Sequence, residues 1–383
     1  MYPYKSIRLK TIFILLIAAS FVYSLCACTP QADGQREVGG KENAAAAKNI
    51  ILLIGDGMGF EQIEAGRIYN DKKPFAMDGM PYQGSVITNA YIKEIPTDSA
   101  AAATALATGN KVVHYSVAMR DGIPLKSITE YSMDAGKKTG IVATKDITDA
   151  TPAAFSSHAP SRSNEEEIMT CQINSNIDLF MGQGKSKFDP YAGLLTSKGY
   201  TYVNTKAELE ACDAAKIFAT FDFISPQSEH SLSYLTRKAI DILSKENEKG
   251  FFLMVEGSKI DSACHANNLE EMIAELNAFD QAAAVALDFA VEDKNTLVIV
   301  VADHETGDLI LPPDAGKQDL NNQLFHTGAH TSKKVPYFAY GPTADSFSQE
   351  IENTEIFVHM MSAFCFEITE SRETGYLNLS PAA

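Results

Sequence analysis

Residues 49–56 have the sequence NIILLIGD, a short apolar run that ends directly in a carboxylate, and this stretch decides the fold. The run shows no polar alternation, which is typical of a strand buried on both faces of a parallel sheet. Similar runs, rich in β-branched residues, occur at residues 139–143, 251–255, 296–302 and 335–340. Helical patterns lie between them, at residues 100–108, 125–135, 232–248 and 269–291. This alternation predicts an α/β fold, a three-layer sandwich with a central, mostly parallel sheet flanked by helices.

Acidic residues follow three of these apolar runs, at the point where each expected strand ends. Asp56 follows the first run, Glu256 follows FFLMV and Asp303 follows TLVIVVA. Because ligands of open α/β sheets bind beyond the carboxyl ends of the strands, the three carboxylates are expected to converge on one edge of the sheet. Carboxylates packed together repel one another and are costly to desolvate unless a cation lies between them. The sequence therefore predicts a metal site at this edge.

Histidines accompany two of these carboxylates. Asp261 and His265, in EGSKIDSACH, are four residues apart and would share one face of a helix, and Asp303 is followed directly by His304. Taken alone, the first pair is typical of a surface salt bridge or a helix cap, and the second of a turn. Together they supply the mixed oxygen and imidazole ligands that suit zinc, beside all-oxygen ligands that suit magnesium.

A serine lies at the expected start of the helix at residues 100–108. Asp98 and Ser99 precede an alanine-rich segment that Gly109 closes. The common role for such residues is the N-cap. The alternative is that Ser99 is a nucleophile, because N–H groups at a helix N-terminus favour an alkoxide and a phosphate. The candidate metal ligands elsewhere in the chain favour this second interpretation.

The N-terminus has the pattern of an export signal. Lys5, Arg8 and Lys10 precede an apolar run too short for a comfortable membrane span, and the run ends in LCAC, which resembles the bacterial lipoprotein cleavage box. We expect a signal peptide at residues 1–27, a lipid anchor on Cys28 and an exported, membrane-anchored lipoprotein, periplasmic or at the cell surface. An ordinary secretory signal and a stop-transfer anchor are the alternatives.

The rest of the chain divides into a tether and one large domain. Residues 28–48 are polar and rich in Gly and Ala, which predicts a flexible tether. Residues 49–383 are expected to form the functional domain, in which the less regular segment at residues 164–228 forms a cap near the site. Four cysteines follow the tether and allow either two disulfides of unknown pairing or four buried thiols: Cys171, Cys212, Cys264 and Cys365.

The chain is strongly acidic, with a formal net charge of -17. Nothing in such a composition would neutralise a phosphate backbone over an extended surface, which argues against a nucleic-acid scaffold as a partner. Recognition of a phosphate group would have to be local, through metal ions or single arginines.

Six segments, in this order, resemble the bacterial alkaline phosphatases: NIILLIGDGMG, PTDSAAAATALATGNK, DATPAAFSSHAPSR, FFLMVEGSKIDSACH, TLVIVVADHETG and HTSKKVPYFAYGP. They span residues 49–342, and the chain is identified by them as a member of this family. The resemblance implies a metal-dependent phosphomonoester hydrolase that forms a phosphoserine intermediate and releases inorganic phosphate from a broad range of monoesters. It also implies two zinc ions, one magnesium ion and a homodimer.

The resemblance assigns roles to residues that match the motifs. Ser99 is the implied nucleophile, Arg162 the guanidinium that grips two phosphate oxygens, and Asp98 the carboxylate that positions the arginine. The implied ligands are Asp261, His265 and His330 for one zinc ion, Asp56, Asp303 and His304 for the other, and Asp56, Thr151 and Glu256 for magnesium, with Asp149 holding a metal-bound water.

Some points stay open in this comparison. His326 lies four residues before His330. The spacing to the following expected strand favours His330, rather than His326, as the ligand. Many bacterial members have a lysine directly after the aspartate that corresponds to Asp261, but this chain has Ser262, which puts secondary phosphate contacts in doubt. The alternatives to a phosphomonoesterase are a phosphodiesterase or sulfatase on the same scaffold, and a metal- or phosphate-binding lipoprotein without turnover.

Overall fold

The structure is a computed structural model that describes residues 46–347, 349–370 and 377–381. The expected signal peptide, the expected lipid anchor on Cys28 and residues 28–45 of the expected tether lie outside the described residues. Within the described ranges, no helix combines the length and the apolar character that a membrane crossing requires.

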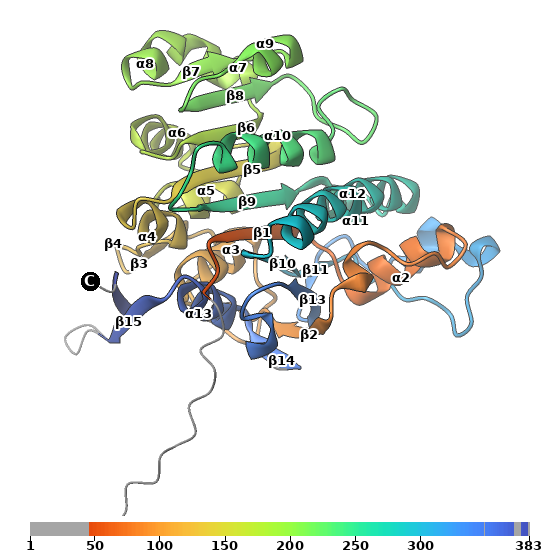
Figure 1. Ribbon diagram of the computed structural model, residues 1–383. Coiled ribbons are helices and arrows are strands. Elements are labelled where there is room, and N and C mark those ends of the chain that lie inside the picture. The colour runs from red at the N-terminus through yellow and green to blue at the C-terminus, as the bar shows by residue number, and fades with distance from the viewer. Residues whose placement is uncertain (1–45, 348, 371–376, 382–383) are drawn as a thin grey trace, which may run out of the picture. The chain divides into compact units, whose positions relative to one another are not determined.

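A ten-stranded sheet forms the centre of the fold, with the strand order β14-β2-β13-β10-β1-β9-β5-β6-β8-β7 (Figure 1). All neighbouring pairs are parallel except the two that involve β13, which runs antiparallel to β10 and to β2. In sheet order the strands are β14 (Glu350–Glu352), β2 (Tyr82–Ile87), β13 (Val335–Tyr340), β10 (Thr296–Ala302), β1 (Asn49–Gly55), β9 (Phe251–Gly257), β5 (Lys138–Asp146), β6 (Leu179–Gln183), β8 (Ile217–Phe221) and β7 (Thr201–Val203).

Helices cover both faces of this sheet. One face carries α2 (Phe60–Tyr69), α10 (Leu232–Ser244), α11 (Lys259–His265) and α12 (Leu269–Asp293). The other carries α3 (Ser99–Thr108), α4 (Ile128–Asp134), α5 (Ala150–Ser156), α6 (Glu165–Asn174) and α13 (Asn353–Ala363). The short helices α7 (Lys185–Phe188), α8 (Ala192–Ser197) and α9 (Lys206–Ala211) lie by the β7 edge (Figure 1). The predicted three-layer α/β sandwich with a mostly parallel sheet is confirmed.

Three two-stranded ribbons lie outside the central sheet among the described residues. They are β3 (Met119–Arg120) with β4 (Ile123–Pro124), β11 (Glu305–Thr306) with β12 (His330–Thr331), and β15 (Phe366–Glu370) with β16 (Leu377–Pro381). The ribbon of β11 and β12 matters for the site, because its register sets Thr306 opposite His330.

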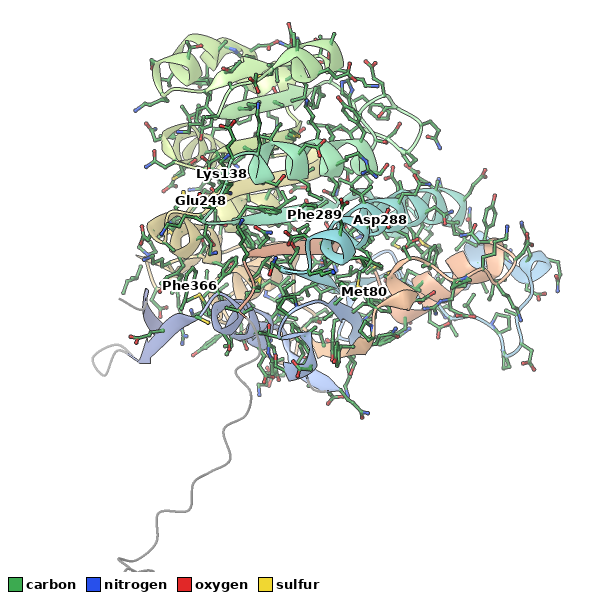
Figure 2. The ribbon with its side chains drawn as sticks, viewed as in Figure 1. Met80, Lys138, Glu248, Asp288, Phe289 and Phe366 are labelled. Carbon is green, nitrogen blue, oxygen red and sulfur yellow. The ribbon has the colours of Figure 1, made fainter. Side chains whose placement is uncertain are left out.

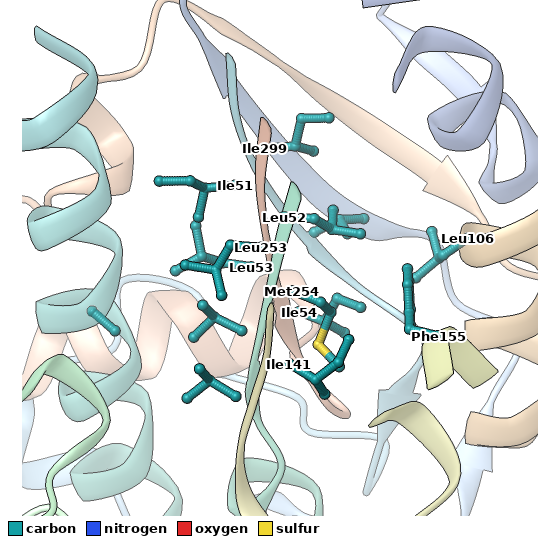
Figure 3. Packing of buried hydrophobic residues seen from close by; sticks show 14 of the residues in the cluster. Ile51, Leu52, Leu53, Ile54, Leu106, Ile141, Phe155, Leu253, Met254 and Ile299 are labelled. Carbon is teal, nitrogen blue, oxygen red and sulfur yellow. The ribbon is translucent and has the colours of Figure 1, made fainter. Parts of the chain in front are cut away.

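The core follows from the period of two along the central strands. On β1, Leu52 and Ile54 lie on the same side of the sheet as Leu106 of α3 and Phe155 of α5, whereas Ile51 lies on the opposite side (Figure 3). All seven residues of β1 are buried, as are all seven of β9 and of β10. Continuous apolar runs therefore mark these strands because both faces of the sheet are covered by helices.

Neighbouring positions on α12 differ in their contact with the sheet. Along α12, Asp288 is exposed, whereas the neighbouring Phe289 packs against Phe251 of β9 with ring centroids 5.9 Å apart (Figure 2). This contrast between adjacent positions is what a helix that packs one face on a sheet requires.

The segment at residues 164–228 differs from the expected cap. It contains α6, β6, α7, α8, β7, α9 and β8, and its strands extend the central sheet beyond β5. Its strands are three to five residues long, so their sequences carry little periodicity. Pairing with β5, rather than local pattern, determines that they belong to the sheet.

The described cysteines form no disulfide: Cys171, Cys212, Cys264 and Cys365 are all free thiols. Only Cys264 is buried, so the alternative of four buried thiols is wrong for the other three residues.

Candidate active site

The expected carboxylates lie where the sequence predicts, at or just beyond the carboxyl ends of three neighbouring strands. Asp56 follows β1, Glu256 is the penultimate residue of β9, and Asp303 follows β10. All three side chains are nearly or fully buried, with exposures of 3%, 1% and 0%. Parallel pairing of β1 with both neighbours brings these strand ends to the same edge of the sheet.

Asp56, Asp303 and His304 form the first candidate metal-binding group, and all three are buried. His304 Nε2 lies 3.5 Å from Asp56 Oδ1 and 3.2 Å from Asp303 Oδ2. These two carboxylate oxygens have no hydrogen-bond partner among the described residues. Buried acceptors without a donor are costly, so the donor set fits a cation with oxygen and nitrogen ligands.

Asp261, His265 and His330 form the second candidate group. His265 Nε2 lies 3.3 Å from Asp261 Oδ2 and 3.1 Å from His330 Nε2, and His330 Nε2 lies 3.6 Å from Asp261 Oδ1. The Nδ1 atoms face backbone carbonyls, that of Gly328 at 2.7 Å and that of Thr97 at 2.8 Å. A carbonyl accepts from Nδ1–H, so both Nε2 atoms present lone pairs to the same point, as zinc ligation requires.

Thr306 of β11 connects the two groups and was not among the sequence-predicted site residues. Its hydroxyl donates to Asp261 Oδ1 at 2.6 Å, and its Oγ1 lies 3.2 Å from His304 Nδ1. The hydroxyl can accept from His304 Nδ1–H while it donates to Asp261, which leaves His304 Nε2 free to bind a metal. The only available signal is its position two residues after His304, inside the quoted TLVIVVADHETG segment.

Ser99 is the first residue of α3, and its Oγ lies 3.3 Å from His304 Nε2. The hydroxyl is therefore adjacent to the first metal-binding group. Asp98 is the N-cap of this helix and accepts from the N–H groups of Ala100 at 3.4 Å and Ala101 at 3.2 Å. These N–H groups are satisfied by Asp98, so they are not the free phosphate donors that the sequence suggested.

Arg162 lies between two carboxylates. Its Nη2 donates to Asp149 Oδ1 at 2.8 Å, and its Nη1 lies 3.6 Å from Asp98 Oδ2. Its backbone N–H also donates to the carbonyl of Tyr115 at 2.7 Å. Asp98 thus caps the helix that carries Ser99 and also lies close to Arg162, which holds the guanidinium near Ser99.

The remaining predicted ligands lie on adjacent elements. Thr151 is in the first turn of α5, and its buried Oγ1 has no hydrogen-bond partner among the described residues. Glu256 Oε2 accepts from the Ser258 hydroxyl at 2.6 Å. Asp149 is the N-cap of α5 and is bonded to Arg162. His326, in contrast, is exposed and belongs to neither metal-binding group.

Burial without a cation shifts the pKa values of the acidic residues. Burial, together with nearby Asp149, raises the pKa of Glu256 to about 8, and burial with nearby Asp261 raises the pKa of Asp303 to about 7. The pKa of Asp56 is raised well above its usual range, first by burial and then by Asp303. Such shifts indicate carboxylates that require a positive charge among them to stay ionised at neutral pH.

In contrast to these raised values, the pKa values of Asp261 and His304 are both lowered. Burial acts to raise the pKa of Asp261, but its hydrogen bond with His265 and the nearby His304 outweigh burial, so its pKa is lowered. Burial lowers the pKa of His304 well below its usual value, and His330 adds to this effect. Asp261 is thus held ionised and His304 neutral, the states in which both bind metal ions.

A buried serine next to a candidate metal-binding group, with a second such group and an arginine nearby, is the kind of site found in metal-dependent hydrolases with an α/β fold. The chain matches the family model for alkaline phosphatase over residues 47–320. It is 30% identical over 455 residues to Alkaline phosphatase 3 of Bacillus subtilis (strain 168), covering 94% of this chain and 98% of that protein.

Solved structures give the same result. The alkaline phosphatase from the Antarctic bacterium TAB5 is 36% identical, covers 84% of this chain and 99% of its own, and has a TM-score of 0.76. A variant of that enzyme with Mg bound in its M3 site is 35% identical, with the same coverage and TM-score. The chain belongs to the alkaline phosphatase family, and it is a hydrolase of the phosphomonoesterase class.

Proposed function

We propose that this enzyme hydrolyses phosphomonoesters through a phosphoserine intermediate on Ser99. The observation that carries the proposal is the distance of 3.3 Å between Ser99 Oγ and His304 Nε2, which places the hydroxyl beside a metal-binding group. A phosphodiesterase, a sulfatase and a binding protein without turnover have no comparable observation in their favour.

The proposed cofactors are two zinc ions and one magnesium ion. Asp261, His265 and His330 would hold one zinc ion, and Asp56, Asp303 and His304 the other. Asp56, Thr151 and Glu256, with Asp149 in the outer shell, would hold magnesium. The unpartnered oxygens of Asp56, Asp303 and Thr151 support these assignments, as does the Mg bound by the TAB5 variant. When bound, the ions supply the positive charge that ionises the serine hydroxyl and a water molecule near neutral pH.

In the proposed reaction, Ser99 Oγ loses its proton to solvent and attacks phosphorus in line. The bond between phosphorus and the ester oxygen breaks, the ester oxygen keeps that electron pair, and it takes a proton from solvent as the alcohol leaves. Arg162 holds two oxygens of the phosphoryl group during transfer, because its planar fork matches them. Water then attacks phosphorus of the phosphoserine, the bond between phosphorus and Ser99 Oγ breaks, and Oγ takes up a proton as inorganic phosphate is released. Positioning and charge stabilisation carry the rate, as is usual for phosphoryl transfer.

The same proposal extends to substrate range and location. The alcohol makes no required contact in this reaction, so we expect a broad range of monoesters to be hydrolysed. The N-terminal pattern supports export and a lipid anchor on Cys28, which would place the enzyme at a membrane, periplasmic or at the cell surface. Homodimerisation is proposed from family membership.

The test is hydrolysis of p-nitrophenyl phosphate, bis-p-nitrophenyl phosphate and p-nitrophenyl sulfate by the purified chain, before and after chelation. We expect the monoester to be preferred by at least about a hundredfold, and activity to require divalent ions. Several unrelated monoesters are expected to react with kcat/KM values within roughly tenfold of one another. Preference for the diester or sulfate, or metal-independent turnover, would refute the proposal.

Substitution of His330 and His326 separates the two candidate ligands. His330→Ala removes one of three ligands from the second group and is expected to reduce kcat at least about a hundredfold and to release bound zinc. His326→Ala is the matched control, because that side chain is exposed and outside both groups, and its activity should remain within about twofold of wild type. Zinc content by mass spectrometry and steady-state rates measure both; the reverse pattern would make His326 the ligand.

Substitution of Thr306 tests the connection between the groups. Thr306→Val keeps the shape but loses the donor to Asp261 and the acceptor for His304, so we expect a loss of metal affinity of roughly tenfold to a hundredfold. Thr306→Ser keeps the hydroxyl and should retain most of the affinity. Zinc titration with a competing chelator measures this, and equal affinities for the valine variant and wild type would contradict the proposed role.

A further inference from the structure

Lys145 lies at the edge of the site and takes no part in the reaction described above. It occurs near the end of β5, where the register with β6 shifts between Val142 and Asp146. The preceding residue, Thr144, is fixed because its Oγ1 accepts from the Ser258 N–H at 2.9 Å, next to Glu256. The irregularity in β5 thus places a lysine beside the strand ends that carry the buried carboxylates.

The ammonium group of Lys145 has donors that the protein does not use. Its Nζ lies 3.9 Å from Asp149 Oδ2, which is beyond hydrogen-bond distance, and it makes no hydrogen bond to any described residue. Its side chain is 27% exposed. On its other oxygen, Asp149 binds Arg162 at 2.8 Å, so this carboxylate lies between the guanidinium and the ammonium group.

Neighbouring lysines are engaged differently. Lys187 forms ion pairs with Asp146, at 2.7 Å, and with Glu165. Lys259 donates to Gln183 Oε1 at 2.8 Å and to the carbonyl of Ile224. Both amino groups are therefore committed to protein acceptors, in contrast to that of Lys145.

Two cavities meet at Lys145. A polar cavity of about 430 Å³ is lined by Lys145, Asp149, Arg162 and Lys187, among others. A second cavity of about 410 Å³ is lined by Lys145, Ser262 and the exposed Phe223, among others. Lys145 therefore lies between the cavity that contains Arg162 and the cavity that contains Ser262. Ser262 is uncharged and cannot itself balance the charge of an anion.

We propose that Lys145 is a second cationic contact for the phosphoryl group, acting beside Arg162. The inference rests on the proposed function and deepens it. A monoester carries two negative charges, and Arg162, already bonded to Asp149, is the one side-chain cation among the proposed phosphate contacts, beside the proposed metal ions. The three N–H donors of Lys145 make no hydrogen bond to a described residue, and Lys145 lines the same cavity as Arg162, so a phosphate oxygen can complete their hydrogen bonding.

The test is binding of inorganic phosphate to the zinc- and magnesium-loaded protein, measured by isothermal titration for wild type, Lys145→Met, Lys145→Arg and Lys187→Met. We expect the Kd to rise about tenfold in Lys145→Met, as for the loss of one charge-assisted hydrogen bond, with bound metal unchanged. Lys145→Arg should restore binding to within about threefold. Lys187→Met is the matched control for general charge and should shift Kd less than about twofold.

Steady-state kinetics give the second readout. The KM for p-nitrophenyl phosphate should rise with the Kd in Lys145→Met, whereas kcat should change less than about threefold. An unchanged phosphate Kd in Lys145→Met would overturn the inference, as would a loss of kcat and metal with an unchanged KM, or an equal effect in Lys187→Met. Phosphate binding is measured without turnover, so its result is independent of the p-nitrophenyl phosphate assay that tests the proposed function.

Discussion

Replacement of Ser99 by alanine is expected to lower kcat for p-nitrophenyl phosphate by about a thousandfold or more, because it removes the proposed nucleophile. The change should be structurally mild. Ser99 is 4% exposed and begins the buried alanine-rich helix α3, in which alanine is the most favourable residue. The Asp98 cap does not depend on the Ser99 hydroxyl. Metal content and melting temperature should therefore stay close to wild type while turnover is lost.

A matched control is Ser132→Ala. Ser132 is also a buried serine in a helix, but its hydroxyl donates to the carbonyl of Ile128 within α4 and forms no hydrogen bond with a site residue among those described. This variant should keep kcat within about twofold. Retention of more than a tenth of wild-type kcat by Ser99→Ala would contradict the nucleophile assignment.

Removal of the divalent ions is expected to abolish turnover and to make folding stability fall as pH rises from 6.5 to 8. In the metal-free protein the pKa of Glu256 is raised to about 8 and that of Asp303 to about 7. The unfolded chain has already lost these protons at pH 6.5, so it binds fewer protons than the folded chain, and stability decreases until the folded groups ionise. The raised pKa of Glu256 alone lowers the free energy of unfolding by about 2 kcal/mol over this interval.

Histidines of the site do not reverse this slope. The pKa of His265 is raised by its hydrogen bond to Asp261, so its stabilisation is present below the unfolded pKa and is lost as pH rises through the folded pKa. The lowered pKa of His304 acts below the unfolded value, where it makes stability rise with pH. Above pH 6.5 the carboxylates therefore determine that folding stability falls as pH rises.

Urea denaturation of metal-free and reloaded protein at several pH values measures the effect. Reloading with zinc and magnesium should remove most of the slope, because the ions compensate the buried carboxylates in their charged form. A metal-free protein whose stability is constant or rises between pH 6.5 and 8 would contradict the account of this cluster.

The central strands could be predicted from sequence nearly to the residue. Residues 296–302 and 335–340 were expected as strands, and β10 and β13 have these bounds. Their apolar runs are continuous because both faces are covered, which is a local signal with a single structural cause. The antiparallel direction of β13 was not predictable in this way, since it depends on the path of the chain between β10 and β13 rather than on the residues of the strand.

The strands at the β7 end of the sheet were not predicted from the sequence, because they are too short to give a local signal. The strand β7 has only three residues, TYV, and β6 and β8 have five each, so none gives a period that a sequence reading can use. Their neighbours in the sheet determine that they are strands. The expected cap therefore became three more strands and their connecting helices.

Some residues of the candidate site could be predicted from the sequence, and others could not. Asp56, Glu256 and Asp303 were expected together because each ends a buried strand, and the structure places them at one edge of the sheet. Thr306 and Lys145 were not expected, since the first is positioned by the pairing of β11 with β12 and the second by an irregularity in β5. Both features arise from tertiary pairing.

The central claim is that Ser99 accepts the phosphoryl group, and the most direct measurement is acid quenching of the metal-loaded enzyme during turnover of p-nitrophenyl phosphate, followed by peptide mass spectrometry. Acid stops hydrolysis of the phosphoserine, so the account predicts that the peptide containing Ser99 gains the mass of one phosphoryl group. The Ser99→Ala variant should show no such gain. Absence of the modification in a turning-over enzyme, or its appearance on another residue, would contradict the account.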